Sequence, residues 1–200
     1  MTSHDDIIHE EILKAALRLY RKYGPTKVTM ENVAKATSRS RSALYYYFKN
    51  RDEIFQAVLE RIAEDVAAEI RLAVTAAATL DGKIFAYCSA KIKTSQEWKS
   101  VFSAMDQVMD ADEKSKHTKV GDALHKKLIY LERGILAEAL SAAGQQTSRI
   151  PGNAELDMLA FIISSGVRGI RREIYDYNDP HDAKAAVQLL SDMVTKWLQS

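Results

Sequence analysis

The sequence has little of what disulfide-bonded and membrane-spanning proteins require. Cys88 is the single cysteine among 200 residues, which excludes an internal disulfide and fits a reducing compartment such as the cytoplasm. No run of 18 or more apolar residues occurs, so we expect no membrane-spanning helix. The acidic start of the chain lacks the apolar stretch of a signal peptide. These absences favour a cytoplasmic protein.

Patterns typical of enzymes and metal sites are also lacking. The five histidines are scattered, and neither His-x-x-x-His nor Glu-x-x-His occurs. Asp122 and His125 would share one helix face, but two ligands rarely hold a metal. There is no G-x-S-x-G motif, no suggestive pairing of cysteine with histidine and no glycine-rich phosphate loop. We therefore expect no catalysis, no metal and no cofactor.

What is present is long helical periodicity. Prolines number three and glycines eight, alternating strand patterns are absent, and 46% of the residues are hydrophobic. The sequence thus predicts an all-α protein with a real core. We expect a short helix capped by Thr29 and further helices over about 6–23, 40–48, 50–78, 84–94, 96–110, 119–143, 153–177 and 179–199, with a charged loop at 111–118. Asn50, Asn153 and Asp179 are the expected N-caps of three of them.

The most informative segment is 28–48, which predicts two short helices joined by a tight polar turn. Thr29 is a good N-cap with Asn32 three positions later, and Thr37 and Ser38 interrupt the apolar pattern before a second helix from about Ser40. Two helices joined in this way make a helix-turn-helix, whose second helix can enter the DNA major groove. The segment therefore predicts a DNA-binding unit.

A helical wheel separates the two sides of the second helix. Leu44 and Phe48 form the buried stripe, Tyr46 falls nearly opposite, and Tyr47 fits either a half-buried aromatic or a DNA contact. Arginine can bind guanine edges or phosphates, and tyrosine hydroxyls can donate to phosphate oxygens. No acidic residue occurs between Glu31 and Asp52. The predicted DNA-facing residues are Thr29, Arg39, Arg41, Ser42, Tyr45, Tyr46, Tyr47, Lys49 and Arg51.

The charge is distributed unevenly along the chain. The overall formal charge is +1, but residues 1–51 contain ten Lys and Arg against five Asp and Glu, whereas residues 52–200 contain eighteen against twenty-two. A basic N-terminal part on an acidic body is typical of a nucleic-acid-binding head on a larger domain.

Residues 12–55 resemble the DNA-binding domain of the TetR (tetracycline repressor) family. The resemblance rests on an ordered set of short matches, namely Ile12 to Tyr20, Gly24, Val28 to Met30, Val33-Ala34, Ser40, Leu44 to Phe48 and Asp52 to Phe55. Two residues depart from the family pattern, because Ser38 stands where glycine is usual and Arg51 where lysine is frequent. Serine at a turn position with positive φ costs about 1 kcal/mol relative to glycine.

The resemblance implies a two-domain organisation and a function. Residues 1–50 would be a three-helix DNA-binding domain, and residues 51–200 a helical effector-binding and dimerisation domain. It implies a regulator, most often a repressor, that binds a palindromic double-stranded DNA operator as a homodimer and is released by a small-molecule effector. A helical ligand-binding or adaptor protein without operator binding is the alternative.

The last two expected helices have unusually wide apolar stripes. Such stripes fit burial on two sides, against their own core and against a partner chain, and two helices from each of two chains make a four-helix bundle. Packing within one chain is the alternative. The expected dimer-interface residues are Ile162, Gly166, Ile170, Ala186, Leu190, Met193 and Trp197.

The middle of the chain is the expected place of an effector pocket. Methionine and aromatic side chains suit an adaptable apolar site, although each of them can equally be ordinary core. Arg168 could meet an anionic group or pair with an acidic residue such as Asp157, Glu138 or Asp106. The candidate lining residues are Phe85, Tyr87, Trp98, Phe102, Met105, Met109, His125, Tyr130, Phe161 and Arg168.

Overall fold

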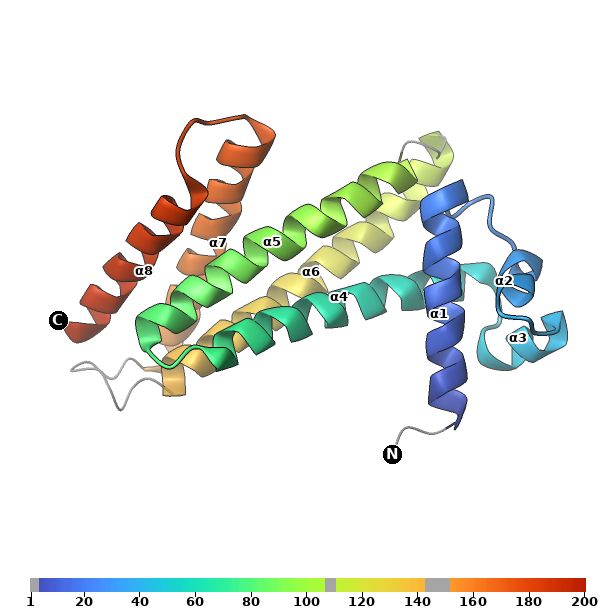
Figure 1. Cartoon of the computed structure of the whole chain (residues 1–200), viewed down its shortest axis with the longest axis horizontal. Coiled ribbons are helices and arrows are strands. Elements are labelled where there is room, and N and C mark those ends of the chain that lie inside the picture. Colours follow the sequence, from blue (N-terminus) through green and yellow to red (C-terminus); the bar gives the residue numbers. More distant parts are fainter. Residues whose placement is uncertain (1–3, 107–110, 143–151) are drawn as a thin grey trace. The chain divides into compact units, whose positions relative to one another are not determined.

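The computed structural model describes residues 4–106, 111–142 and 152–200, apart from the side chains of residues 100–102, 104–106 and 111–121. Within these ranges every regular element is an α-helix, which confirms the all-α prediction (Figure 1). The helices are α1 (His4–Tyr23), α2 (Met30–Ala36), α3 (Arg41–Tyr47), α4 (Arg51–Ala76), α5 (Leu80–Asp106), α6 (Ala111–Ala142), α7 (Asn153–Asp176) and α8 (Ala183–Gln199). No described helix is long and apolar enough to cross a membrane.

The middle of the chain differs from the sequence prediction. The two helices expected between residues 84 and 110 are one helix, α5, which already begins at Leu80 because the Thr79 hydroxyl accepts from the backbone N–H of Gly82 at 3.1 Å. Thr94 does not break α5, since its hydroxyl donates to the carbonyl of Ala90 within the helix. The loop predicted at 111–118 is also wrong, because α6 begins at Ala111.

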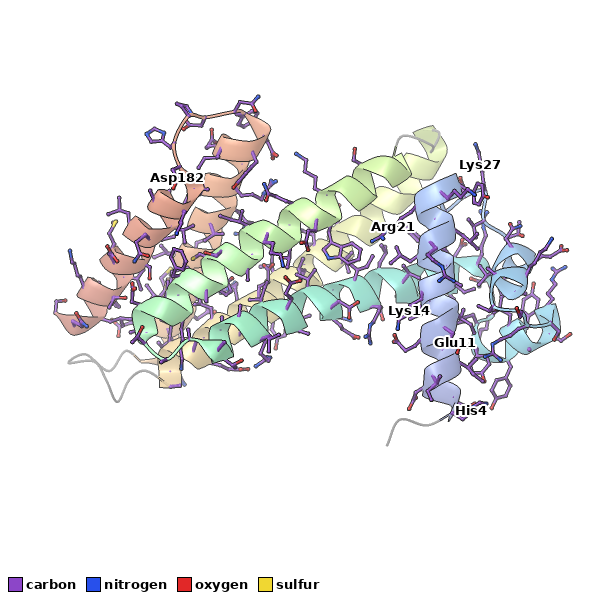
Figure 2. The ribbon with its side chains drawn as sticks, viewed as in Figure 1. His4, Glu11, Lys14, Arg21, Lys27 and Asp182 are labelled. Atoms are coloured by element: carbon purple, nitrogen blue, oxygen red, sulfur yellow. The ribbon has the colours of Figure 1, made fainter. Side chains whose placement is uncertain are left out.

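Two predicted caps are displaced by one to three residues. α7 starts from Gly152, whose N–H donates to Glu155 Oε2 at 3.2 Å, so Asn153 lies inside the first turn. The cap of α8 is Asp182, with Oδ1 2.7 Å from the N–H of Ala185, and Figure 2 labels it at the start of that helix. Asp179 accepts instead from the backbone N–H of His181.

The chain folds as two compact units. The first comprises Met1–Glu64 with Glu97–His125, and the second comprises Asp65–Gln96 with Lys126–Ser200. Helices α4, α5 and α6 each contribute residues to both units. The functional boundary at residue 50, between a DNA-binding part and the remainder, stays a prediction.

Each unit has its own apolar core. In the first, α1 packs against α2 and α2 against α3, around fully buried residues such as Ile12, Leu44 and Ile54 (Figure 1). In the second, α7 packs against α8, and buried residues recur at helical spacing along every helix. Those of the second unit include Val66, Ile70, Val74, Ile84, Ile135, Leu136, Leu159, Ile163, Val167, Val187, Val194 and Leu198.

Candidate nucleic-acid interface

The first helix of the predicted helix-turn-helix is held by a reciprocal cap. The side chain of Thr29 accepts from the backbone N–H of Asn32 at 3.2 Å, and Asn32 Oδ1 accepts from the backbone N–H of Thr29 at 2.9 Å. Ser40 caps α3 in the same manner, with Oγ 3.1 Å from the N–H of Ala43. Both caps satisfy N–H groups that a helix leaves without partners, so α2 and α3 begin where the sequence predicts.

The turn between these helices passes through Ser38 in a left-handed conformation. Its φ is 54°, and its N–H donates to the carbonyl of Lys35 while that of Arg39 donates to Ala34. These two bonds form a Schellman motif, in which the left-handed position is usually glycine. The expectation that this serine sits at a positive φ is confirmed, and its Cβ makes the turn less stable than glycine would.

The two faces of α3 separate as the helical wheel predicts. Leu44 is fully buried and Phe48 is 3% exposed, whereas Tyr46 is 76% exposed. Tyr45 on the flank is 43% exposed, and Ser42 and the neighbouring Lys49 are exposed as well. An aromatic ring so exposed on a short helix offers a contact surface for another molecule.

Tyr47 takes an intermediate position. Its side chain is half-buried, its hydroxyl donates to Asp5 Oδ1 at 3.1 Å, and its ring meets that of Tyr46 edge-on with centroids 5.0 Å apart. Burial, together with the bond to Asp5, raises the pKa of the Tyr47 phenol. Tyr47 therefore supports Tyr46 from the side and also ties α3 to the start of α1.

Arg41 is held against an aromatic ring. Its guanidinium lies 5.6 Å from the ring centroid of Tyr45, and Nη2 donates to the Tyr45 hydroxyl at 3.2 Å. Both side chains are on the exposed side of α3. Stacking on an aromatic face restricts an arginine that is otherwise flexible, which prepares its planar fork for a bidentate contact.

A hollow of about 410 Å³ opens beside Arg41. Asn50 at its edge caps α4, with Oδ1 2.9 Å from the N–H of Glu53. The hollow thus lies at the N-termini of both α2 and α4, which carry partial positive charge and favour anions. Its lining residues are Thr29, Met30, Glu31, Arg41, Tyr45, Asn50 and Arg51.

Arg39 and Arg51 are partly engaged within the protein. Arg39 Nη2 is 2.7 Å from Glu11 Oε2, and its side chain is 27% exposed. Figure 2 labels Glu11 about midway along α1. Arg51 Nη1 donates to the backbone carbonyl of Thr26 at 2.6 Å, although half of its side chain remains exposed. Both arginines therefore also brace the domain.

The predicted effector residues are divided between the two units, and of these Tyr87 and Arg168 lie within electrostatic reach of each other in the second unit. Trp98 belongs to the first unit, where the guanidinium of Arg21 lies 5.6 Å from its ring, whereas Phe85 belongs to the second. His125, Tyr130 and Phe161 are exposed. The side chains of Phe102 and Met105, and the whole of Met109, lie outside the described residues.

The predicted dimer residues do lie on two helices that pack together. Ile162, Met193 and Trp197 are exposed by 51%, 61% and 38%. Gly166, Ile170, Ala186 and Leu190 are half-buried, and a Cβ built on Gly166 would meet Leu190 at 3.5 Å. Met158, Phe161 and Leu189 add further exposed apolar surface on the same two helices. The pair α7 and α8 thus carries apolar side chains that its own unit does not cover.

A polar cluster inside the second unit was not predicted as a group. Lys91 of α5 is 6% exposed and forms an ion pair with Glu132 of α6, which is 3% exposed. Burial, and then the positive charge of Arg168, lower the pKa of Lys91, whereas the carboxylate of Glu132 beside it favours the charged ammonium. The available signal in the sequence was Tyr87 and Lys91 four positions apart on an otherwise apolar helix face.

Comparison with known proteins agrees with this architecture. The sequence pattern of a family described as bacterial regulatory proteins, tetR family, matches residues 12–58. Residues 12–58 of this chain are thus similar to a tetR-family domain. The transcriptional regulator AcrR of Shigella flexneri is 32% identical over 63 residues, which are 32% of this chain and 29% of that protein. The transcriptional regulator TtgR of Pseudomonas putida is 33% identical over 54 residues, 27% and 26% of the two chains.

These curated relatives are matched over less than a third of their length. Solved structures extend the likeness over the whole fold. The TetR family repressor AlkX from Dietzia sp. superimposes with a TM-score of 0.55 at 22% identity, and the match covers 96% of this chain and 95% of that one. The tetR-type likeness in sequence thus includes residues 12–58, whereas the helical fold is shared over nearly the whole chain.

Proposed function

We propose that the protein is a DNA-binding transcriptional regulator, most simply a repressor, which binds a palindromic operator as a homodimer and is released by a small-molecule effector. The observation that carries the proposal is Tyr46, 76% exposed on the outer face of a capped α3 beside an arginine stacked on Tyr45. Residues 1–50 would then be the DNA-binding domain and residues 51–200 the effector-binding and dimerisation domain. A DNA partner also places the protein in the cytoplasm.

The residues divide by the part of DNA they would contact. Arg41, held by Tyr45, is suited to a bidentate contact with a guanine edge. Tyr46 and Ser42 can donate hydroxyls to phosphates, and Lys49 adds positive charge. Thr29 and Arg51, which line the hollow between the starts of α2 and α4 together with Glu31, are the proposed contacts of one backbone phosphate. Phosphate contacts set the register, and base contacts set the sequence preference.

Dimerisation would use the exposed apolar face of α7 and α8. Two such helices from each of two chains form a four-helix bundle. A two-fold dimer places two recognition helices on half-sites about 34–36 Å apart, or a multiple of this, so the operator should be an inverted repeat. An effector that binds one arrangement of residues 51–200 better than another would change operator affinity.

The first experiment is selection of bound duplexes from a random DNA pool with the full-length protein. We expect an enriched inverted repeat and affinity that falls steeply with salt. Arg41→Ala should cost about 1–3 kcal/mol at one base pair and relax the choice there. Tyr46→Phe should weaken binding to all sequences alike, because a phosphate bond carries no sequence information.

Lys126→Ala is the matched control for Arg41→Ala. It removes one positive charge from an exposed position in the second unit, outside the predicted DNA-facing set. We expect no change in base preference for this variant. Enrichment of no duplex over random DNA would refute the regulator proposal and favour a ligand-binding or adaptor protein instead.

A further inference from the structure

Five polar residues of the second unit lie together in its interior. Tyr87 and Lys91 are one turn apart on α5, Ser164 and Arg168 are one turn apart on α7, and Glu132 comes from α6. Tyr87, Lys91, Glu132 and Ser164 are each no more than 6% exposed. Arg168 is half-buried and lies within electrostatic reach of both Tyr87 and Lys91. We call these five residues the Arg168 cluster.

The charges of the Arg168 cluster do not cancel. Lys91 and Glu132 neutralise each other. Arg168 donates from Nη1 to Ser164 Oγ at 2.9 Å and from Nη2 to Ser165 Oγ at 2.8 Å, and both acceptors are neutral. Within the described part of the chain no carboxylate pairs with Arg168. A half-buried guanidinium with hydroxyl partners only leaves a positive charge without its counterion.

The neighbouring cations have carboxylates of their own. Arg133 pairs with Asp157 at 2.5 Å, and Arg171 pairs with Asp176 at 2.9 Å. Their carboxylates are therefore engaged elsewhere and do not neutralise Arg168. The uncompensated charge is specific to this one residue among the arginines of α7 that face the interior.

Tyr87 supplies a second group without a partner. Its side chain is fully buried, and its hydroxyl makes no hydrogen bond of normal geometry with any described residue, although the Ser164 hydroxyl lies close enough to lower the pKa of the phenol slightly. Burial raises the pKa of the phenol to about 12, so the hydroxyl keeps its proton at neutral pH. A buried donor without an acceptor costs about 1–3 kcal/mol, which a bound acceptor would recover.

The turns beside the cluster are apolar. Ile84 and Cys88 on α5, Leu136 on α6 and Ile163 and Val167 on α7 are all at most 1% exposed. The surroundings of the cluster are thus apolar, so a molecule that satisfied Arg168 and Tyr87 would join one anionic end to an apolar body. An arginine fork and a phenol together match the two oxygens of a carboxylate.

We propose that the Arg168 cluster binds the carboxylate of a small acid with an apolar body, one oxygen accepting from the guanidinium of Arg168 and the other from the hydroxyl of Tyr87. The proposal rests on the proposed function, because it names the chemical class of the effector. Lys91 and Glu132 neutralise each other beside the site, so that Arg168 supplies its net positive charge. Ser164 and Ser165 accept hydrogen bonds from the guanidinium and orient it.

The test compares acids with amides of the same skeleton on the full-length protein. Calorimetry at pH 7.5 measures binding of octanoate against octanamide and of benzoate against benzamide. We expect at least one acid to bind about 10-fold or more tightly than its amide, since charge-assisted hydrogen bonds are roughly twice as strong as neutral ones. Equal binding of acids and amides, or binding by neither acid, would overturn the proposal.

Variants assign the effect to the cluster. Arg168→Met should abolish the preference for acid, and Tyr87→Phe should reduce acid affinity severalfold. Arg172→Met, which removes an exposed charge one turn further along α7, should bind as the parent does. An equal loss in the Arg172 variant would refute the assignment.

Thermal unfolding without any acid separates a binding role from a structural one. Removing an unpartnered buried hydroxyl should leave the midpoint of Tyr87→Phe unchanged or raise it. A fall in the midpoint of this variant would mean that the hydroxyl serves the fold, against the proposal. Tyr87→Phe also keeps the acid-binding test decisive where Arg168→Met does not fold.

The two proposals can fail independently. Acid binding is measured without DNA, and DNA selection is measured without acid. Acid binding by a protein that selects no duplex would leave the cluster assignment standing and remove the regulator proposal. If the protein selected an operator but bound neither acid more tightly than its amide, the regulator proposal would stand and the cluster assignment would fall.

Discussion

Breaking the buried ion pair between Lys91 and Glu132 should produce two variants with opposite pH dependence. In Glu132→Gln, Lys91 keeps its buried place but loses its counterion. The ammonium is then expected to release its proton in the folded state, and it would regain the proton on unfolding. In Lys91→Met, Glu132 is the group left alone, and we expect it to take up a proton on folding.

The magnitudes follow from the proton equilibria. Lysine has an ordinary pKa of 10.5, so neutralising it at pH 7.5 costs about 4 kcal/mol, at 1.36 kcal/mol per pH unit. Glutamate has an ordinary pKa of about 4.3, so protonating it at pH 7.5 also costs about 4 kcal/mol. These are upper values, because water that reaches the group lowers the cost.

The signs are opposite because the two groups exchange protons in opposite directions on unfolding. The unfolded Glu132→Gln chain binds more protons than the folded one, so its stability should rise with pH, by about 2–3 kcal/mol between pH 7.5 and 9.5. The unfolded Lys91→Met chain binds fewer, so its stability should fall with pH, by the same amount between pH 5.5 and 7.5. The double variant Lys91→Met/Glu132→Leu should be near neutral, since no buried charge remains.

Urea unfolding followed by circular dichroism at pH 5.5, 7.5 and 9.5 measures these free energies, each relative to the parent at the same pH. Protein concentration must be equal throughout, because dimerisation stabilises by mass action. If both single variants lost less than about 1 kcal/mol of unfolding free energy at pH 7.5, the idea of a tightly buried ion pair would be refuted. Parallel pH slopes would show that something other than an unpaired charge destabilises the variants.

Three shorter predictions concern the turn, the dimer and alkaline unfolding. Ser38→Gly should raise the free energy of unfolding by about 1 kcal/mol, because φ is 54° and the turn's two bonds use only backbone; Ser42→Gly within α3 should lower it by a similar amount, and equal effects would refute the strain argument. Met193→Glu on the exposed face of α8 should give a light-scattering mass near that of one chain, whereas Lys14→Glu on α1 should remain a dimer; an unchanged mass for both would refute the interface. Burial raises the pKa of Tyr87 to about 12, so this residue's contribution should be present below pH 10 and decline by up to about 2.7 kcal/mol toward pH 12, an alkaline loss that Tyr87→Phe should lack in urea titrations.

The N-terminal site could be predicted closely because its determinants are local. The caps by Thr29 and Ser40, the positive φ of Ser38 and the exposure of Tyr46 all depend on residues within one or two turns. Hydrogen bonds across three positions and a helical period of 3.6 residues are visible in any sequence. No contact from elsewhere in the chain was needed to place them.

The middle of the chain could not be predicted to the same degree. The segment 111–118 is polar and was expected to be a loop, yet it continues as part of α6. Its alanine, glutamate and lysine residues are good helix formers, but polarity alone does not distinguish an exposed helix from a loop. The helix end expected near residue 95 is also wrong, because the Thr94 hydroxyl donates to the carbonyl of Ala90 within α5 and the helix continues.

By itself the sequence determined the class of fold, the helix-turn-helix and the side of α3 that faces outward, because periodicity and capping are properties of neighbouring residues. Only the tertiary structure decided which charges meet. It pairs Arg39 with Glu11 across 28 positions and Lys91 with Glu132 across 41, and among the described residues it leaves Arg168 with hydroxyl partners only. Partners so distant are chosen by how the helices pack, and the free energy of a charge depends on that packing through burial and through the groups brought beside it.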